Sequence, residues 1–315
     1  MDRTSEGEIV TRVIYLGGLG RSGTTLLERM LGALPGVCAL GEVVHLWQRD
    51  VRDDERCGCG QAFSACDFWR VVGERAFGGW NRAPVDRILA LRGQVERTRH
   101  IPRLARWHLP GGYGAQVAEY AYFYTRVYEA AAAETGAHAV VDSSKHSALA
   151  YCLAYAPDLD LRVVHMVRDS RGVAYSWTKT VPRPETGGER EMHRYAPGRA
   201  ALLWNAHNAA FGLLRRTGVP VYRLRYEELV ADPAGVLREV AKFAGIDPGP
   251  MDFFGDGTVR LGTSHSAAGN PMRFTTGEVP LRHDDAWRAA LPPRQRRLVG
   301  VLTAPLLSAY GYGRR

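Results

Sequence analysis

A short loop near the N-terminus combines glycines, hydroxyl side chains and one arginine. It reads GLGRSGTT (residues 18–25) and directly follows the apolar stretch 12–18. Glycines let successive backbone N–H groups turn toward an anion, and the N-terminus of a following helix adds the positive end of its dipole. A simple turn between strand and helix would explain the glycines but not the Arg-Ser-x-Thr-Thr run. The loop therefore predicts a phosphate site.

The same loop has the spacing of the P-loop G-x-x-x-x-G-K-[ST], but Thr24 stands where that motif has lysine. P-loop kinases use the lysine on the β- and γ-phosphates of a nucleoside triphosphate, with magnesium nearby. The substitution argues against a triphosphate ligand. The expected anion-binding residues are Gly20, Arg21, Ser22, Gly23, Thr24 and Thr25.

A second anion site is predicted after the apolar stretch 161–169. Arg168 lies at the end of this stretch, and Ser176 follows eight residues later. An arginine can donate two parallel hydrogen bonds to phosphate oxygens, and the serine can reach the same phosphate if the chain curls around it. An Arg-Asp pair is often only a surface ion pair, but a strand-terminal arginine with a serine at this offset, downstream of the glycine loop, is more specific.

These segments resemble the cofactor motifs of PAPS-dependent sulfotransferases, which use 3'-phosphoadenosine-5'-phosphosulfate (PAPS). GRSGTTLL is similar to the family's 5'-phosphosulfate loop, VVHMVRDSRGVAYSW to its 3'-phosphate motif, and RYEELVADPAGVLREVAKFAGI to the part after its next strand. The resemblance covers residues 12–277 and is lost over 57–135, where we expect acceptor recognition. It implies a bacterial sulfotransferase that moves the sulfuryl group of PAPS onto a hydroxyl of a small or medium-sized molecule, leaving PAP (the 3',5'-bisphosphate).

The resemblance also suggests residues for the rest of the cofactor. Tyr226 matches a position near the adenine, where an aromatic hydroxyl can pack and hydrogen-bond; packing beneath the sheet is an equal alternative. HSAAGNPMRFTTG (residues 265–277) stands where the family has a late basic loop that closes over the 3'-phosphate. Asn270 and Arg273 are the candidates there.

The acceptor hydroxyl needs a general base, and Glu42 is the first candidate. Tyrosylprotein-type sulfotransferases have a similar Gly-Glu pair after the same helix, and that glutamate is their base. His146 is the second candidate, because it adjoins Lys145. Lys145 lies 23 residues before Arg168, in a loop that directly follows a predicted strand. His108, in a Trp-His-Leu-Pro segment that looks like the histidine motif of cytosolic sulfotransferases, is too far from Arg168 and follows no strand.

Lys145 and Arg21 are expected to share the charge that develops on the transferred group. Asp142, three residues before Lys145, is expected to cap the following helix.

Two other functions stay open. A kinase or other nucleotide phosphotransferase is favoured only by the similarity of HAVVD (residues 138–142) to a magnesium-binding strand end, and a non-catalytic nucleotide-binding module remains the other alternative.

The elements that position these residues alternate between strands and helices. Apolar runs predict strands at 12–18, 138–142, 161–169 and within 219–229. Helical spacing of apolar residues predicts helices at 23–34, 82–99, 113–135, 189–216 (with a break near Pro197) and 284–310. Two further helices are expected to begin at about 171 and at 232. Residues 255–281 are expected to form a long loop. This order predicts one P-loop-like α/β domain over 1–315, with helices on both faces of a parallel sheet and a helical insertion at about 81–135. The loops after Gly17, Val141 and Val167 should converge.

Composition sets the remaining expectations. The chain has 315 residues, 45% hydrophobic, with a formal net charge of +8. The charge is scattered, which favours a small polyanion over nucleic acid. No apolar run is long enough for a membrane span, and the polar first twelve residues contain no apolar core of a signal peptide. We therefore expect a cytoplasmic protein without nucleic-acid or membrane partners; the oligomeric state is left open.

Cysteine and aromatic residues complete the pattern. Cys57, Cys59 and Cys66 form C-x-C-x6-C, which has too few ligands for a closed zinc site. No metal is expected; a local structural loop is favoured, and a metal with a fourth ligand from elsewhere or a disulfide is the less favoured alternative. Aromatic residues of the insertion are expected to pack between helices rather than line the acceptor pocket, namely Trp107, Tyr113, Tyr120 and Tyr124.

Overall fold

A five-stranded parallel sheet forms the centre of the molecule in a computed structural model, which describes residues 10–106, 108–186, 188 and 190–313. The strand order is β2-β3-β1-β4-β5. Their bounds are β1 (Thr11–Gly17), β2 (Val37–Ala39), β3 (Ala139–Lys145), β4 (Leu159–Val167) and β5 (Val221–Arg225). β1 and β4 are largely apolar because helices cover the sheet on both sides, whereas β3 ends in Asp-Ser-Ser-Lys and the edge strand β5 carries two arginines.

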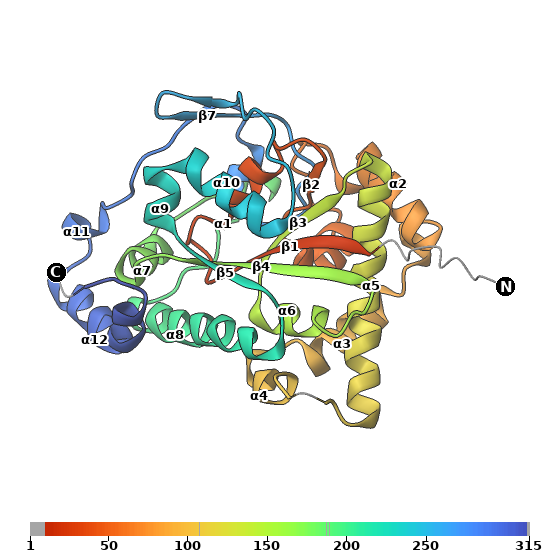
Figure 1. Ribbon diagram of the computed structural model, residues 1–315, viewed down its shortest axis with the longest axis horizontal. Helices are drawn as coiled ribbons and strands as arrows, with labels where there is room; N and C mark the ends of the chain where they lie inside the picture. The colour runs from red at the N-terminus through yellow and green to blue at the C-terminus, as the bar shows by residue number, and fades with distance from the viewer. Residues whose placement is uncertain (1–9, 107, 187, 189, 314–315) are drawn as a thin grey trace.

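Helices lie on both faces of the sheet (Figure 1), and the side chains of β1 alternate between these faces. Val13 and Tyr15 pack in one hydrophobic cluster, and Ile14 and Leu16 in another, because successive residues of a strand point to opposite sides. The first face is covered by α5 (Gly111–Thr135), α6 (Ser147–Leu153) and α8 (Pro197–Leu214), and the second by α1 (Thr24–Leu31), α9 (Tyr226–Ala231) and α10 (Pro233–Ala244). The predicted α/β class with helices on both faces is confirmed.

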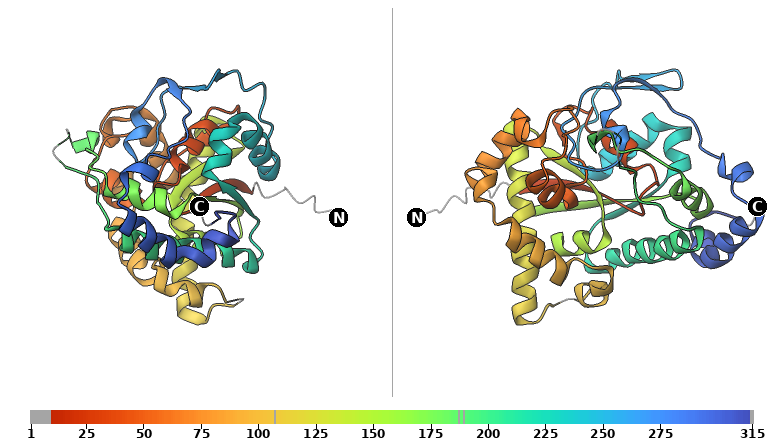
Figure 2. Two further views of the ribbon diagram at one scale, coloured as in Figure 1. Left: turned by 90° about the vertical axis from the view of Figure 1, so that its left-hand side faces the viewer. Right: turned by 180° about the vertical axis from the view of Figure 1, so that it is seen from behind.

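The helical insertion is larger than predicted. It begins with α2 (Asp67–Phe77) and continues through α3 (Val85–Val95) and α4 (Ile101–Leu104) to α5. Figure 2 shows it at the end of the molecule opposite α12 (Pro293–Ala309). Tyr113, Tyr120 and Tyr124 are buried among its helices, as expected for packing residues, and Trp107 lies outside the described residues.

Prolines shift several predicted boundaries. The helix expected from 189 begins only at Pro197, the N1 residue of α8, because proline lacks the backbone N–H that a helix interior needs; residue 189 lies outside the described residues. The C-terminal region forms α11 (Trp287–Ala290) and α12 instead of one helix, with Pro292 between them. The Asp232 carboxylate accepts a hydrogen bond from the Gly235 N–H at 2.9 Å, and so caps α10 as predicted.

The loop predicted over residues 255–281 contains regular structure. It forms an antiparallel sheet of β6 (Phe254–Gly255), β7 (Thr258–Leu261) and β8 (Gly277–Pro280), and between β7 and β8 Ala267 forms an isolated bridge with Gly41. The glycine and serine residues of this segment do not give a strand pattern in the sequence. The short strands form because they pair with residues up to about twenty positions away in the chain. Across the described ranges, no helix is both long and apolar enough to span a bilayer.

Candidate active site

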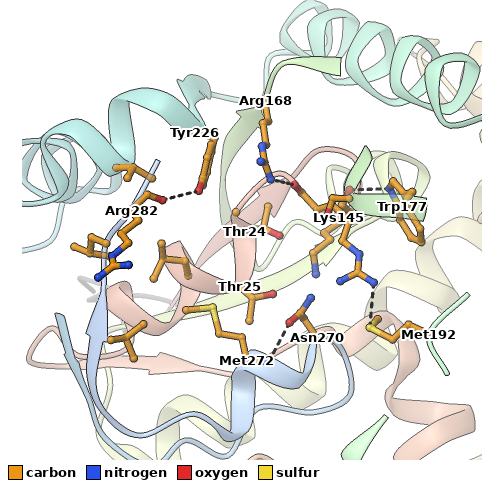
Figure 3. A pocket seen from close by; sticks show the side chains of 18 of the residues that line it. Thr24, Thr25, Lys145, Arg168, Trp177, Met192, Tyr226, Asn270, Met272 and Arg282 are labelled. Atoms are coloured by element: carbon orange, nitrogen blue, oxygen red, sulfur yellow. Dashed lines mark hydrogen bonds between the residues drawn. The ribbon is translucent and has the colours of Figure 1, made fainter. Parts of the chain in front are cut away.

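Three loops converge at the carboxyl edge of the sheet. In register, Gly17 of β1 pairs with Lys145 of β3 on one side and with His165 of β4 on the other. Since β1 lies between these strands, the loops that follow them meet at one place, as predicted. There they enclose a pocket of about 330 Å³ (Figure 3).

Most of the predicted site residues line this pocket. They are Gly20, Arg21, Gly23, Thr24, Thr25, Glu42, Lys145, Arg168, Ser176, Tyr226 and Asn270. Ser22 is only 1% exposed and lies behind the pocket surface. Trp177, Met192, Met272 and Arg282 also line the pocket, and sequence reasoning had assigned them no role.

The glycine loop has the geometry of an anion site. Gly23 has φ 93° and precedes α1, and within the part of the chain that the structure describes no side chain caps the first N–H groups of that helix, so they are available to a ligand. Arg21 also has a positive φ, 76°, which turns its side chain into the pocket. Its guanidinium contacts the Met192 sulfur at 3.3 Å and lies 5.3 Å from the Trp177 ring centre. Within the described ranges it forms no ion pair, so its charge is free for an anion.

Trp177 from α7 (Ser170–Thr178) supports the glycine loop. Its indole N–H donates to the Gly20 carbonyl at 3.1 Å. A Cβ on Gly20 would come within 3.0 Å of the same ring, so this position favours glycine. Trp177 directly follows Ser176 in the predicted 3'-phosphate motif. This position was the one feature of the sequence that could have indicated its role.

Arg168 lies at the end of β4, as predicted, and is 6% exposed. Its guanidinium donates to the Arg21 carbonyl at 3.2 Å and pairs with the Asp284 carboxylate at 3.0 Å. The Lys179 ammonium lies 3.8 Å from the same carboxylate. Burial disfavours the charge on Asp284, but Arg168 and Lys179 outweigh it and lower its pKa. The Asp284 carboxylate thus lies where Arg168 and Lys179 stabilise negative charge.

Tyr226 lines the pocket near both Gly23 and Arg168. A Cβ on Gly23 would lie 2.6 Å from its ring, and the Arg168 guanidinium lies 4.4 Å from the ring centre. Its hydroxyl donates to the Arg282 carbonyl at 3.3 Å. The ring lines the pocket and also packs in the buried hydrophobic cluster that contains Leu224 and Leu229. No local pattern marked Arg282, because it reaches the site only through the fold of the preceding small sheet.

Glu42 and Lys145 form an ion pair on the other side of the pocket. Lys145 has φ 65° at the irregular end of β3, which directs its ammonium toward Glu42. The second Glu42 oxygen lies 3.7 Å from His45 Nε2. Burial favours the neutral acid, but Lys145 and His45 outweigh it and lower the pKa of Glu42 to about 2. Burial lowers the pKa of His45 to about 3.

The histidine alternatives lie outside the pocket lining. The His146 Nδ1 is 2.7 Å from a Glu96 carboxylate oxygen, and its ring centre is 5.8 Å from that of His45. His146 is thus near Glu42 but turned to the helical insertion. His108 is exposed between α4 and α5, consistent with its treatment as a lookalike.

Two predicted roles are not supported by the contacts. Asp142 caps no helix: it is fully buried and accepts hydrogen bonds from Ser144 and, at 2.6 Å, from Tyr128. β3 continues to Lys145, so α6 begins after His146 instead. Burial raises the pKa of Asp142 to about 6, and it does not face the pocket as a magnesium ligand would.

Arg273 points away from the pocket, unlike Asn270. It is 1% exposed, and its guanidinium donates to the Arg56 carbonyl at 2.9 Å. The side chain lies in the short helix Pro271–Phe274, whose turn sends it inward. Asn270 caps this helix by accepting from the Met272 N–H at 3.0 Å and remains in the lining.

The sheet is parallel, a glycine-rich loop follows its first strand, and an arginine stands at the end of a neighbouring strand. This combination is typical of α/β proteins that bind phosphorylated cofactors. Residues 14–249 match the model of the sulfotransferase family. The chain therefore belongs to the sulfotransferase family.

Individual relatives agree with this assignment. Carbohydrate sulfotransferase 5 of Mus musculus is 30% identical over an alignment of 184 residues, and the match covers 51% of this chain and 44% of that protein. The chain thus spans less than half the length of this curated relative. The sulfotransferase domain of the Synechococcus PCC 7002 olefin synthase has the same fold, with a TM-score of 0.53 and 19% identity over 97% of this chain and 96% of that one.

Proposed function

We propose that the protein, as a single α/β domain, transfers the sulfuryl group of PAPS to a hydroxyl of a small or medium-sized acceptor. The observation that carries this proposal is that two sets of residues suited to binding anions line one pocket: the loop with Arg21, and Arg168 with Ser176. Two anionic groups on one nucleotide, at its 5' and 3' positions, match two such sets of residues, whereas a triphosphate requires only the first. Membership of the sulfotransferase family supports this choice of donor.

The residues present fit such a cofactor. The open N–H groups of α1, Thr24, Thr25 and Arg21 would hold the 5' end, and Arg168, Ser176 and Arg282 the 3'-phosphate. The Asp284 carboxylate beside Arg168 and Lys179 occupies a place suited to a phosphate oxygen. Tyr226 in the same pocket lining is available to the adenine. When bound, PAPS would supply an activated sulfuryl group, and the mouse relative's name makes a sugar hydroxyl the first acceptor class to test.

Glu42 is the proposed general base. Its carboxylate lines the pocket beside Lys145 and is ionised at neutral pH. We infer that Lys145 moves toward the negative charge of the transferred group during the reaction. Glu42 then loses its counter-ion while it stays buried, and burial raises its affinity for the acceptor proton. Arg21 and Lys145 stabilise the charge on the group in flight.

The donor site is tested by calorimetric titration with PAP and with ADP, which lacks the 3'-phosphate. We expect PAP to bind much more tightly than ADP, and Arg168→Ala to weaken PAP binding about 10- to 100-fold, because a buried charged hydrogen-bond donor is lost. Arg162→Ala is the matched control, since Arg162 lies on the same strand but pairs with Asp160 away from the pocket. Equal affinities for PAP and ADP would contradict the assignment.

The choice between the two bases is tested with His146→Ala. Because His146 pairs with Glu96 and lies outside the pocket lining, we expect kcat to fall by less than about tenfold, below the range for loss of a general base. The measurement is the steady-state rate with saturating PAPS. A loss of about 100-fold or more would make His146 the base and leave Glu42 as a partner of Lys145.

A further inference from the structure

Four metal-binding side chains meet outside the pocket. Cys57, Cys59, Cys66 and His265 bring three sulfurs and one ring nitrogen within 4.8 Å of one another. The Cys66 sulfur lies 3.7 Å from that of Cys57 and 3.8 Å from that of Cys59. The His265 Nδ1 is 3.2 Å from the Cys66 sulfur and 3.8 Å from the Cys57 sulfur. The fourth ligand that C-x-C-x6-C lacks thus comes from a segment 199 residues further along the chain.

Four of the six separations are close to the edges of a tetrahedron around one ion. With Zn–S bonds of about 2.3 Å and a Zn–N bond of about 2.0–2.1 Å, the edges of a tetrahedral site are about 3.8 Å between sulfurs and about 3.5 Å between sulfur and nitrogen. The sulfur pairs at 3.7 and 3.8 Å fit the first value, and the two nitrogen distances fall on either side of the second. All five cysteines are free thiols in the structure, so no disulfide explains the cluster.

Local backbone structure aims the three thiols at one point. Gly60 has φ 89° and donates its N–H to the Cys57 carbonyl at 2.8 Å, which closes a tight turn that contains Cys59. The Cys57 N–H donates to the Gln61 carbonyl at 2.9 Å. Cys66 then stands at the start of α2 as its N-cap residue. Cys57 and Cys66 are fully buried, as expected for ligands enclosed by protein.

His265 is held in place by the opposite segment. Its ring stacks on Phe68 with centres 5.0 Å apart and 24° between the planes. Its carbonyl accepts a hydrogen bond from the Trp69 indole at 2.8 Å, and the Gly58 N–H donates to the Ser266 carbonyl at 3.0 Å. The histidine therefore presents Nδ1 to the sulfurs in a fixed orientation, a supporting shell of the kind that metal sites need.

We propose that Cys57, Cys59, Cys66 and His265 bind one Zn²⁺ ion in a closed structural site. Three thiolates and an imidazole in tetrahedral arrangement select zinc over the oxygen-preferring cations. The protein supplies all four ligands, which leaves no open position for water or substrate, so the ion has a structural and not a catalytic role.

The site joins two parts of the chain next to the pocket. Two residues after His265, Ala267 donates its N–H to the Leu40 carbonyl at 2.8 Å and accepts from the Glu42 N–H at 3.0 Å. Asn270 of the pocket lining follows three residues later. The zinc site thereby anchors the segment that positions the backbone of Glu42, and it ties that segment to the start of the helical insertion.

The direct test is the metal content of the full chain purified without a histidine tag. Mass spectrometry of the metal is expected to give about one zinc per chain after dialysis, and the cobalt-substituted protein is expected to show the absorption of tetrahedral Co²⁺ with thiolate ligands. A protein that folds without bound zinc and does not take up Co²⁺ would overturn the proposal.

Variants assign the ion to these residues. Cys66→Ser and His265→Ala should lose most of the zinc, whereas His265→Cys, which keeps four ligands, should retain it. Cys152→Ala removes another buried cysteine, in α6, and should keep the full zinc content. If a variant fails to fold, X-ray absorption of the unaltered zinc protein still decides, because three sulfurs and one nitrogen are expected around the ion. Any other ligand set, or unchanged zinc in folded Cys66→Ser, would refute the site.

Discussion

Replacing Glu42 with glutamine is expected to lower kcat for sulfuryl transfer by about 100- to 10,000-fold, the usual contribution of a general base. The amide keeps the size of the side chain but cannot accept the acceptor proton. Binding of PAP is expected to change little, because Glu42 pairs with Lys145 and is not among the residues proposed to hold the 3'-phosphate. The measurements are steady-state rates with PAPS and an accepted hydroxyl compound, and calorimetry with PAP.

The matched control for this substitution is Glu134→Gln. Glu134 is a partly exposed glutamate that pairs with Arg75 at 3.2 Å on the helical insertion, and its loss should leave kcat unchanged. A protein that binds PAP but has no transferase activity with any acceptor would favour a non-catalytic binding module. Full activity of Glu42→Gln would exclude Glu42 as the base.

Replacing Lys145 with methionine is expected to lower kcat by about 100- to 1,000-fold, because one preorganised charge no longer stabilises the transferred group. Methionine keeps much of the side-chain length, which limits loss of packing. The same change should also alter the pH dependence, since Lys145 is the main group that keeps Glu42 ionised against its burial.

The direction of that pH effect follows from the pKa of Glu42. The base must be ionised, so activity falls as the pH drops through its pKa. With Lys145 present this pKa is about 2, and kcat/KM should show no Glu42 limb above about pH 4. Without Lys145, burial raises the pKa, and the limb should move up into the acidic-to-neutral range.

The control for both effects is Lys242→Met. Lys242 is an exposed residue of α10, remote from the pocket lining, and its substitution should change neither kcat nor the pH profile. An unchanged acid limb in Lys145→Met would show that Glu42 is not the group whose ionisation the rate reports.

Several features of the fold and site were predictable from short stretches of sequence. The turn after β1, the helix that follows it and the arginine at the end of β4 depend on neighbouring residues: glycines that permit positive φ, apolar periodicity, and a charge at a strand end. The convergence of three loops followed from the rule that parallel strands end at one edge. The family assignment rests on the same contiguous motifs.

Side-chain direction was less predictable where several turns separate a residue from the main sheet. Arg273 was expected in the pocket, but the short helix Pro271–Phe274 turns it inward to Arg56. Arg282 enters the pocket lining through the antiparallel strands before it. A one-residue change of strand register or a single turn of helix can reverse the direction in which a side chain points. The type of the residue does not determine that direction.

The sequence by itself determined the glycine-rich loop, the strand-end arginine and the class of fold, because each arises from interactions among residues close in the chain. Only the tertiary structure decided which distant groups act together. It paired Glu42 with Lys145 across 103 residues and brought His265 to the three cysteines. Such pairs form when separate segments pack on the same sheet, so their partners are set by the packing of the whole domain and not by local preference.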